Sequence, residues 1–314
     1  MTEPARIRGV LSPVVTPFSA DLTPDPARFL AHCRWLLSQN CGLAFLGTNS
    51  EANSLSLAER LGLMDALFEA GLDTRRMMPG TGSCALSDTV ALTRHAVQHG
   101  CAGVLMLPPF YYKGVPEAGL YRYFSEVVER VGDARLRLYL YHIPPVAVVG
   151  ITPGLVERLL KAYPTAIAGM KDSSGDWDNT KTFLDAFATS GFDVFVGSES
   201  FLLRAMRNGG VGTISATANV NPAAIHALYS GWQQPDAEAQ QQRLDRVRDT
   251  IGRKYLMIAA LKETIALYAE DAAWRSVRPP LLPLDSGERA SLAAELAVIG
   301  FTMPGLARAA AASR

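Results

Sequence analysis

Eight short apolar runs, separated by longer stretches with helical signals, constrain the fold of this chain more than any other feature. The runs occupy residues 9–18, 42–47, 76–82, 103–110, 137–144, 166–173, 193–200 and 212–219. Their nearly continuous apolar character is typical of strands that a parallel sheet buries on both faces. Strand–helix alternation repeated eight times predicts an α/β fold, specifically a (β/α)8 TIM barrel. A doubly wound sheet is the alternative, but no G-x-G-x-x-G follows the first run.

Helix starts are marked between the runs. Ser56 and Glu59 have the spacing of a capping box, and Thr152-Pro153 and Asn221-Pro222 each place a capping residue before a proline. From about residue 231 the helical period continues with no further strand-like run. The sequence therefore predicts a barrel over residues 1–230 and a C-terminal helical extension over residues 231–314.

Charge and cysteine usage narrow the class of protein. Thirty basic and thirty acidic residues give zero net charge, so nothing favours a nucleic acid or an anionic membrane as partner. No uninterrupted apolar run reaches the roughly 18 residues of a membrane span, and the N-terminus lacks a signal-peptide pattern. The four cysteines, Cys33, Cys41, Cys84 and Cys101, show no C-x-x-C spacing, and the histidines form no ligand motif. We expect a cytoplasmic protein with reduced thiols and no bound metal.

Two polar side chains near the ends of the fifth and sixth runs point to chemistry. Active sites of barrels lie at the carboxyl ends of the strands. Side-chain alternation puts Tyr141 and Lys171 at equivalent positions on strands about 4.8 Å apart, so a phenol and an amine would meet there. Such an amine can attack a carbonyl to form a Schiff base, and the phenol can shuttle protons. The alternative is that Lys171 snorkels, with its charged head in water.

Several motifs, in order, resemble one known family. They are VVTPF (14–18), GTNSE (47–51), GTG (80–82), PPFYY (108–112), YHIP (141–144), GMKDSSGD (169–176) and GTISATAN (212–219). In them the chain resembles the dihydrodipicolinate synthase / N-acetylneuraminate lyase superfamily, the class I pyruvate aldolases, over roughly residues 8–300. The resemblance implies a barrel enzyme that acts on a small 2-oxo acid without a cofactor, as a homodimer or homotetramer.

The resemblance also implies catalytic roles. Lys171 would form the imine with the keto carbon of the substrate, and Tyr141 would be the general acid and base beside it. Thr48 would relay protons to Tyr141, and Tyr111 would complete the relay from a neighbouring subunit. No metal is required, because the protonated imine is itself the electron sink.

Three of the substrate-binding residues follow from the same resemblance. Thr48 and Asn49, with backbone N–H groups, would hold the substrate carboxylate, and Ile214 would offer its backbone carbonyl near the imine. Gly197 and Glu199, at the end of the seventh run, would line the site; this polar end suits a hydroxylated or neutral substrate. Glu51 is expected to order the loop rather than take part in the reaction.

Two departures from the family pattern affect the function. Ser50 replaces a motif glycine, which would cost roughly 1 kcal/mol if that position needs a positive φ. Val146 stands where dihydrodipicolinate synthases carry an arginine for the carboxylate of the second substrate. The leading interpretation is a Schiff-base lyase, an aldolase or dehydratase similar to the 4-hydroxy-2-oxoglutarate aldolase branch. The alternatives are 4-hydroxy-tetrahydrodipicolinate synthase and a ligand-binding barrel without catalysis.

Overall fold

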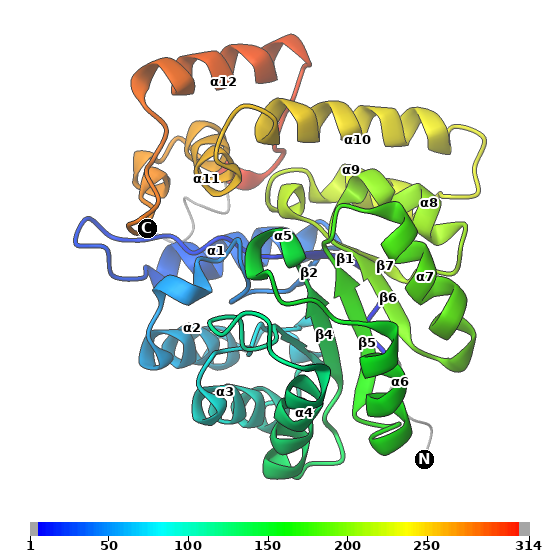
Figure 1. The fold of residues 1–314 in the computed structure, drawn as a ribbon. Coiled ribbons are helices and arrows are strands. Elements are labelled where there is room, and N and C mark those ends of the chain that lie inside the picture. The colour runs from blue at the N-terminus through cyan, green and yellow to red at the C-terminus, as the bar shows by residue number, and fades with distance from the viewer. Residues whose placement is uncertain (1–5, 308–314) are drawn as a thin grey trace. The chain divides into compact units, whose positions relative to one another are not determined.

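The computed structural model describes residues 6–307 (Figure 1). These residues form two compact units. The first unit comprises residues 6–9 and 73–214, and the second comprises residues 10–72 and 215–307. Each unit therefore combines stretches that lie far apart in the sequence.

The first unit is built on five parallel strands that neighbour one another in the order β7-β6-β5-β4-β3. The strands are β3 (Val104–Met106), β4 (Leu138–His142), β5 (Ile167–Asp172), β6 (Asp193–Val196) and β7 (Gly212–Ile214). All of their residues are buried, as the continuous apolar runs predict. A doubly wound sheet would reverse its strand order at a switch point, so the sequential order argues against that alternative. The predicted α/β class with a parallel sheet is confirmed.

The third apolar run, residues 76–82, differs from the prediction because it forms no strand of its own. Leu105 donates its N–H to the Pro79 carbonyl and accepts a bond from the Thr81 N–H, each at 2.9 Å. Gly80 thus pairs with β3 as a single bridge. Pro79 has no N–H with which to extend the ladder, so the run stops at one bridge.

The helices of the first unit follow its strands. They are α3 (Leu86–Gln98), α4 (Glu117–Val131), α5 (Pro144–Ala147), α6 (Pro153–Ala162), α7 (Trp177–Phe187) and α8 (Leu202–Met206), with 3₁₀ turns η2 (Thr74–Arg76), η3 (Ala188–Ser190) and η4 (Glu199–Phe201). Helix α3 packs on α4, α4 on α6, and α6 on α7 (Figure 1). The predicted cap of α6 is confirmed, because Thr152 Oγ1 accepts a hydrogen bond from the Leu155 N–H at 3.1 Å.

The second unit is mostly helical. Its strands β1 (Gly9–Ser12) and β2 (Gly42–Leu43) pair in parallel. Its helices are α1 (Pro26–Ser38), α2 (Leu57–Glu69), α9 (Pro222–Ser230), α10 (Ala237–Gly252), α11 (Met257–Tyr268) and α12 (Ser286–Val298), with 3₁₀ turns η1 (Ala52–Ser54), η5 (Ala216–Asn219) and η6 (Ala272–Arg275). Helix α10 packs against α9, α11 and α12, and α11 packs against η6. Helix α9 begins at Pro222 as predicted, although the Asn221 side chain makes no capping bond.

All four cysteines are free thiols. Burial raises the pKa of Cys101 to about 12 and that of Cys33 well above its ordinary value, so neither thiol ionises readily. Over residues 6–307, no helix combines the length and the apolar character needed to cross a membrane.

The start of α2 confirms the predicted capping box. Ser56 Oγ accepts a bond from the Glu59 N–H at 3.2 Å, and Glu59 Oε2 accepts one from the Ser56 N–H at 2.8 Å. The Glu59 carboxylate also forms an ion pair with the Arg278 guanidinium. These charge-assisted hydrogen bonds from Arg278 lower the pKa of Glu59 to about 2.

Replacing Glu59 with glutamine keeps the capping box but removes the ion pair. The lowering of the Glu59 pKa corresponds to roughly 3 kcal/mol of interaction free energy. Because the ion pair is partly exposed, solvent screens this interaction, and we expect Glu59→Gln to lose about 1 kcal/mol of unfolding free energy at pH 7. Because the folded-state pKa lies below the unfolded one, this stability is present above pH 4.5 and is lost as the pH falls toward about 2. Urea unfolding from pH 7 downward measures it. Curves for the two proteins that stay equally far apart at every pH would contradict the prediction.

Candidate active site

The ends of β4 and β5 bring a buried amine against a buried phenol. Tyr141 and Lys171 are in register on the two strands, and Lys171 Nζ donates to Tyr141 Oη at 3.2 Å. The nitrogen also lies 4.3 Å from the centre of the Tyr141 ring. Both residues are only 3% exposed. The predicted meeting of phenol and amine is confirmed, and the snorkelling alternative for Lys171 is wrong.

Aromatic rings lie next to the pair on the same strands. Phe195 of β6 is in register with Lys171, and Tyr139 precedes Tyr141 by two residues, on the same face of β4. The two rings meet edge to face with centres 5.8 Å apart, and both side chains are fully buried. Tyr139 Oη donates to Asp193 Oδ2 at 3.2 Å. Rigid apolar packing therefore supports the amine and the phenol from the side of the core.

The residues next to the pair, His142 of β4 and Asp172 of β5, point to the other face of the sheet and bind the segments that follow their strands. Asp172 accepts hydrogen bonds from the Ser174 N–H at 2.9 Å, from Thr180 Oγ1 at 2.6 Å and from Asn179 Nδ2 at 3.0 Å. His142 Nδ1 accepts a bond from the Ile151 N–H at 2.8 Å, and burial lowers the pKa of this histidine. Asp172 thus holds the loop that follows β5, and His142 is a polar residue whose ring nitrogen has a partner.

The sheet continues for one residue past its strands at the candidate site. Ser173 donates its N–H to the His142 carbonyl, and Gly197 donates to the Asp172 carbonyl, both at 2.7 Å. A Cβ on Gly197 would lie 1.9 Å from Ser173 Oγ, so only glycine fits this close approach. The predicted site did not include Ser173, although alternation from Lys171 already places it on the same face.

Two further predicted residues lie at the ends of β6 and β7. Glu199 opens the 3₁₀ turn η4 and is 1% exposed, and Ile214 is the last residue of β7 and is fully buried. Both come from strands that follow β5 in the sheet order.

Tyr111 is not buried with the amine and phenol. Tyr111 and Tyr112 are each 73% exposed, with ring centres 5.3 Å apart. Val146, on α5, is also exposed. Lys113 donates to the Phe110 carbonyl and, at 2.9 Å, to the Ala147 carbonyl, which ties this loop to α5. The exposed tyrosines and valine therefore belong to one region of the first unit.

Thr48 and Asn49 belong to the second unit, where they lie half-buried in a tight turn between β2 and η1. Glu51 donates its N–H to the Thr48 carbonyl at 3.1 Å. The left-handed conformation of the turn lies at Glu51, with φ of 55°, and not at Ser50. Ser50 Oγ accepts a bond from the Gly47 N–H at 3.2 Å and donates to the Val14 carbonyl. Ser50 therefore does not need a positive φ, and the free-energy cost considered for a serine at this motif position does not apply.

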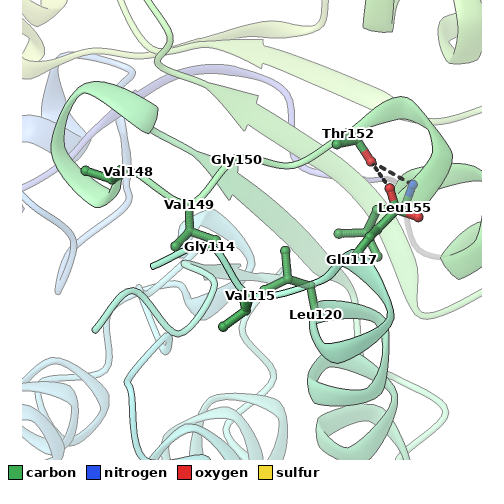
Figure 2. Close-up of a pocket in the computed structure, with 9 residues that line it drawn as sticks. All are labelled: Gly114, Val115, Glu117, Leu120, Val148, Val149, Gly150, Thr152 and Leu155. Carbon is green, nitrogen blue, oxygen red and sulfur yellow. Dashed lines mark hydrogen bonds between the residues drawn. The ribbon is translucent and has the colours of Figure 1, made fainter. Parts of the chain in front are cut away.

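A separate cavity of about 180 Å³ lies in the first unit (Figure 2). It is lined by Gly114, Val115, Glu117, Leu120, Val148, Val149, Gly150, Thr152 and Leu155. The Glu117 carboxylate accepts a bond from Thr152 Oγ1 and lies 3.4 Å from the Arg158 guanidinium. None of the predicted site residues lines this cavity, and its Glu117 and Thr152 side chains already have partners.

The amine and the phenol form an organic acid–base pair. An amine can form an imine with a carbonyl carbon, and a phenol within hydrogen-bond reach can take up or release a proton. Among residues 6–307, no group of three or more His, Cys, Asp or Glu side chains is arranged to hold a metal ion.

Comparison with known proteins places the chain in a family. Residues 6–299 match the profile of the Dihydrodipicolinate synthetase family. The chain belongs to this family. It is also 35% identical to an uncharacterized DapA-like lyase of Chloroflexus aurantiacus, over 94% of this chain and 96% of that protein. The family resemblance inferred from the motifs is thus confirmed.

Two solved structures of the family are similar to the whole fold. The dihydrodipicolinate synthase of Agrobacterium tumefaciens is 28% identical, with a TM-score of 0.85 over 93% of this chain and 99% of that chain. YagE, a prophage protein of the dihydrodipicolinic acid synthase family from Escherichia coli K12, was solved in complex with pyruvate. It is also 28% identical, with a TM-score of 0.84 over 95% of this chain and all of that chain. The relatives thus include a protein named as a lyase, one named as a synthase and one that binds pyruvate.

Proposed function

We propose that this protein is a class I lyase in which Lys171 forms a Schiff base with the keto carbon of a 2-oxo acid. The observation that carries the proposal is the buried contact of 3.2 Å between Lys171 Nζ and Tyr141 Oη. The binding of pyruvate by YagE supports the choice of substrate class.

In the proposed reaction, the free amine of Lys171 attacks the keto carbon and a carbon–nitrogen bond forms. The carbinolamine loses water to give a protonated imine. For a 4-hydroxy-2-oxo acid, a base removes the hydroxyl proton and the C3–C4 bond breaks. Its electron pair moves into the enamine while an aldehyde leaves. Protonation at C3 and hydrolysis then release pyruvate and the amine. Tyr141 Oη, within hydrogen-bond reach of the nitrogen, is the group assigned to move these protons.

The roles of Thr48, Asn49 and Ile214 in the proposal come from the family, and those of Gly197 and Glu199 from the polar end of the strand that carries them. Thr48 relays protons to Tyr141, and Asn49 with neighbouring backbone N–H groups holds the substrate carboxylate. Ile214 offers its backbone carbonyl near the imine. Gly197 and Glu199 line the end of the site that receives the rest of the substrate. The positions of these last three residues at the ends of β6 and β7 support the assignment.

The proposal includes the closed (β/α)8 barrel over residues 1–230, the helical extension over 231–314 and a cytoplasmic location; residues 1–5 and 308–314 of these ranges lie outside the described residues. The sequential order of five parallel strands supports the barrel, as does the TM-score of 0.85 to the Agrobacterium enzyme. The absence of strands after Ile214 within the described residues supports the helical extension. The four free thiols support a reducing compartment.

Substrate choice within the family is inferred from Val146. An exposed valine cannot pair with a carboxylate, so this position offers nothing to the second carboxylate of aspartate semialdehyde. Lys113, a cation whose loop is tied to α5, is bonded to two backbone carbonyls. A hydroxylated 2-oxo acid is therefore favoured over the biosynthetic condensation. The similarity to the Agrobacterium synthase favours that condensation as the second candidate.

Incubation with pyruvate and borohydride should attach a reduced three-carbon adduct to the peptide that contains Lys171. Lys171→Met should abolish the adduct, whereas Lys161→Met, at an exposed lysine of α6, should not change it. EDTA should leave both trapping and turnover intact, because the imine is the electron sink. Mass spectrometry of the digested protein reads the outcome. An unmodified protein at saturating pyruvate contradicts the Schiff-base mechanism and favours a binding protein without catalysis.

Introducing an arginine at position 146 should create the missing cation for aspartate semialdehyde. A charge-assisted hydrogen bond contributes roughly 1.5–3 kcal/mol, so kcat/KM for condensation with pyruvate should rise by about 10- to 150-fold in Val146→Arg. Val146→Leu is the matched control and should leave it unchanged. A wild-type kcat/KM for the semialdehyde of about 10⁴ M⁻¹s⁻¹ or more, above that for hydroxylated 2-oxo acids, would instead support the synthase.

The exposed side chains of Tyr111, Tyr112 and Val148 should form a subunit interface. Light scattering at micromolar concentration should then give a dimer or tetramer of the 33.8 kDa chain. Tyr111→Glu should weaken the assembly, because burying an unpaired carboxylate opposes association. Leu282→Ser, at an exposed leucine of the second unit, should have no effect. A monomeric wild-type protein would contradict both the interface and a relay residue supplied by Tyr111 of a partner.

A further inference from the structure

We propose that Lys262 and Arg278 are positioning residues that fix the turn of residues 47–51 through the carboxylate of Glu51. The inference rests on the proposed function in one respect: Thr48 and Asn49, which this turn carries, are the residues assigned to the substrate carboxylate. It gives the helical C-terminal region a part in the site.

The backbone of the turn needs support at Glu51. This residue has φ of 55° and ψ of 30°, a left-handed conformation that a non-glycine residue adopts at a cost. Three backbone hydrogen bonds close the turn: the Ser50 and Ala52 N–H groups each donate to the Gly47 carbonyl at 3.2 Å, and the Glu51 N–H donates to the Thr48 carbonyl at 3.1 Å. A change in the Glu51 backbone would therefore alter the direction of Thr48 and Asn49.

Lys262, on α11, holds one oxygen of the Glu51 carboxylate. Its Nζ donates to Glu51 Oε1 and, at 2.7 Å, to the Ser276 carbonyl, and it lies 4.3 Å from the centre of the Phe18 ring. The side chains of Lys262 and Glu51 are both 0% exposed. Burial lowers the pKa of Lys262 to about 8, against the opposing effect of the Glu51 carboxylate. Removing either partner would leave the other as an unpaired charge in the interior.

Arg278 holds the other carboxylate oxygen and the residues that follow the turn. Its backbone N–H donates to Glu51 Oε2 at 2.8 Å. Its guanidinium donates to the Ser54 carbonyl at 2.7 Å and to the Leu22 carbonyl at 2.8 and 2.9 Å, and it pairs with Glu59. Arg278 therefore connects the Glu51 side chain, the end of η1 and the start of α2.

The turn is also held through Ser50. Thr16 Oγ1 donates to the Ser50 carbonyl at 2.7 Å, and Ser50 Oγ donates to the Val14 carbonyl. Residues 34 and 36 positions earlier in the chain thus fix the Ser50 side, whereas the donors to Glu51 come from 211 and 227 residues further along. Lys262 and Arg278 are therefore the residues that hold the Glu51 side of the turn.

The test compares Lys262→Met and Glu51→Gln with the wild type. One readout is the pyruvate concentration that gives half-maximal borohydride trapping at Lys171. It should rise roughly 10-fold or more in Lys262→Met, with the adduct still reaching full occupancy at saturating pyruvate. The second readout needs no catalysis: amide hydrogen exchange of residues 48–52 should speed up roughly 10-fold or more. Glu51→Gln should move both readouts in the same direction by less, because the amide oxygen still accepts one bond.

Arg275→Met is the matched control. Arg275 pairs with Glu263 at 2.8 Å, so this variant also breaks an ion pair between η6 and α11, but one that does not involve the turn. Its half-saturating pyruvate concentration and its exchange over residues 48–52 should stay within about twofold of the wild type. Thermal unfolding of all variants shows how far a general loss of stability accompanies the effect.

The outcomes separate this inference from the proposed function. Folded Lys262→Met and Glu51→Gln proteins with wild-type exchange over residues 48–52 overturn the positioning role, as does an equal increase in Arg275→Met. If neither variant folds, the ion pair is a requirement for folding and the positioning role is rejected. A wild-type protein that traps no pyruvate overturns the proposed function instead, while the exchange result still decides the inference. A third outcome concerns Asn49→Ala. If this variant traps pyruvate normally and its half-saturating pyruvate concentration is unchanged, the turn does not bind the substrate carboxylate, but the positioning of the turn by Lys262 and Arg278 still stands.

Discussion

The in-register pairing of β4 with β5 is the constraint on which the candidate site depends. Side chains on a strand alternate between faces, so a slip of one residue would turn Lys171 away from Tyr141 and put Asp172 in its place. Such a slip would also separate Asp172 from Thr180, and His142 from the Ile151 N–H. The polar residues on the outer face therefore secure the register that brings amine and phenol together on the inner face.

Much of this arrangement can be predicted from the sequence, because side chains along a strand alternate between its two faces every residue. Alternation along two buried strands was enough to predict the contact of Lys171 with Tyr141. The same reasoning overestimated the run at residues 76–82, where Pro79 removes a donor and limits the pairing to a single bridge. The loop geometry was also out of reach: the motif alone could not indicate that Glu51, rather than Ser50, takes the left-handed conformation.

Ion pairs between residues far apart in the chain were the largest feature that the sequence did not predict. Glu51 was expected to order its loop, but nothing in the local sequence indicates which cation it meets. The partner, Lys262, lies in a helix whose apolar period explains its packing and gives no sign of the ion pair. The match to the family runs to residue 299, through α11 and α12, and does not stop at the last strand. Because the family match includes α11 and α12, these helices are part of the fold that the family shares.

The two buried lysines show how the partner decides what an amine can do. Lys262 Nζ donates to two acceptors that cannot donate in return, the Glu51 carboxylate and the Ser276 carbonyl. Lys171 Nζ instead meets a phenol hydroxyl, which can accept a hydrogen bond or donate one. Only this second neighbour offers both a donor and an acceptor, which suits the proposed role of Lys171 as a nucleophile and then an iminium nitrogen. The same residue type thus serves as a fixed support in one unit and as the proposed reactive group in the other.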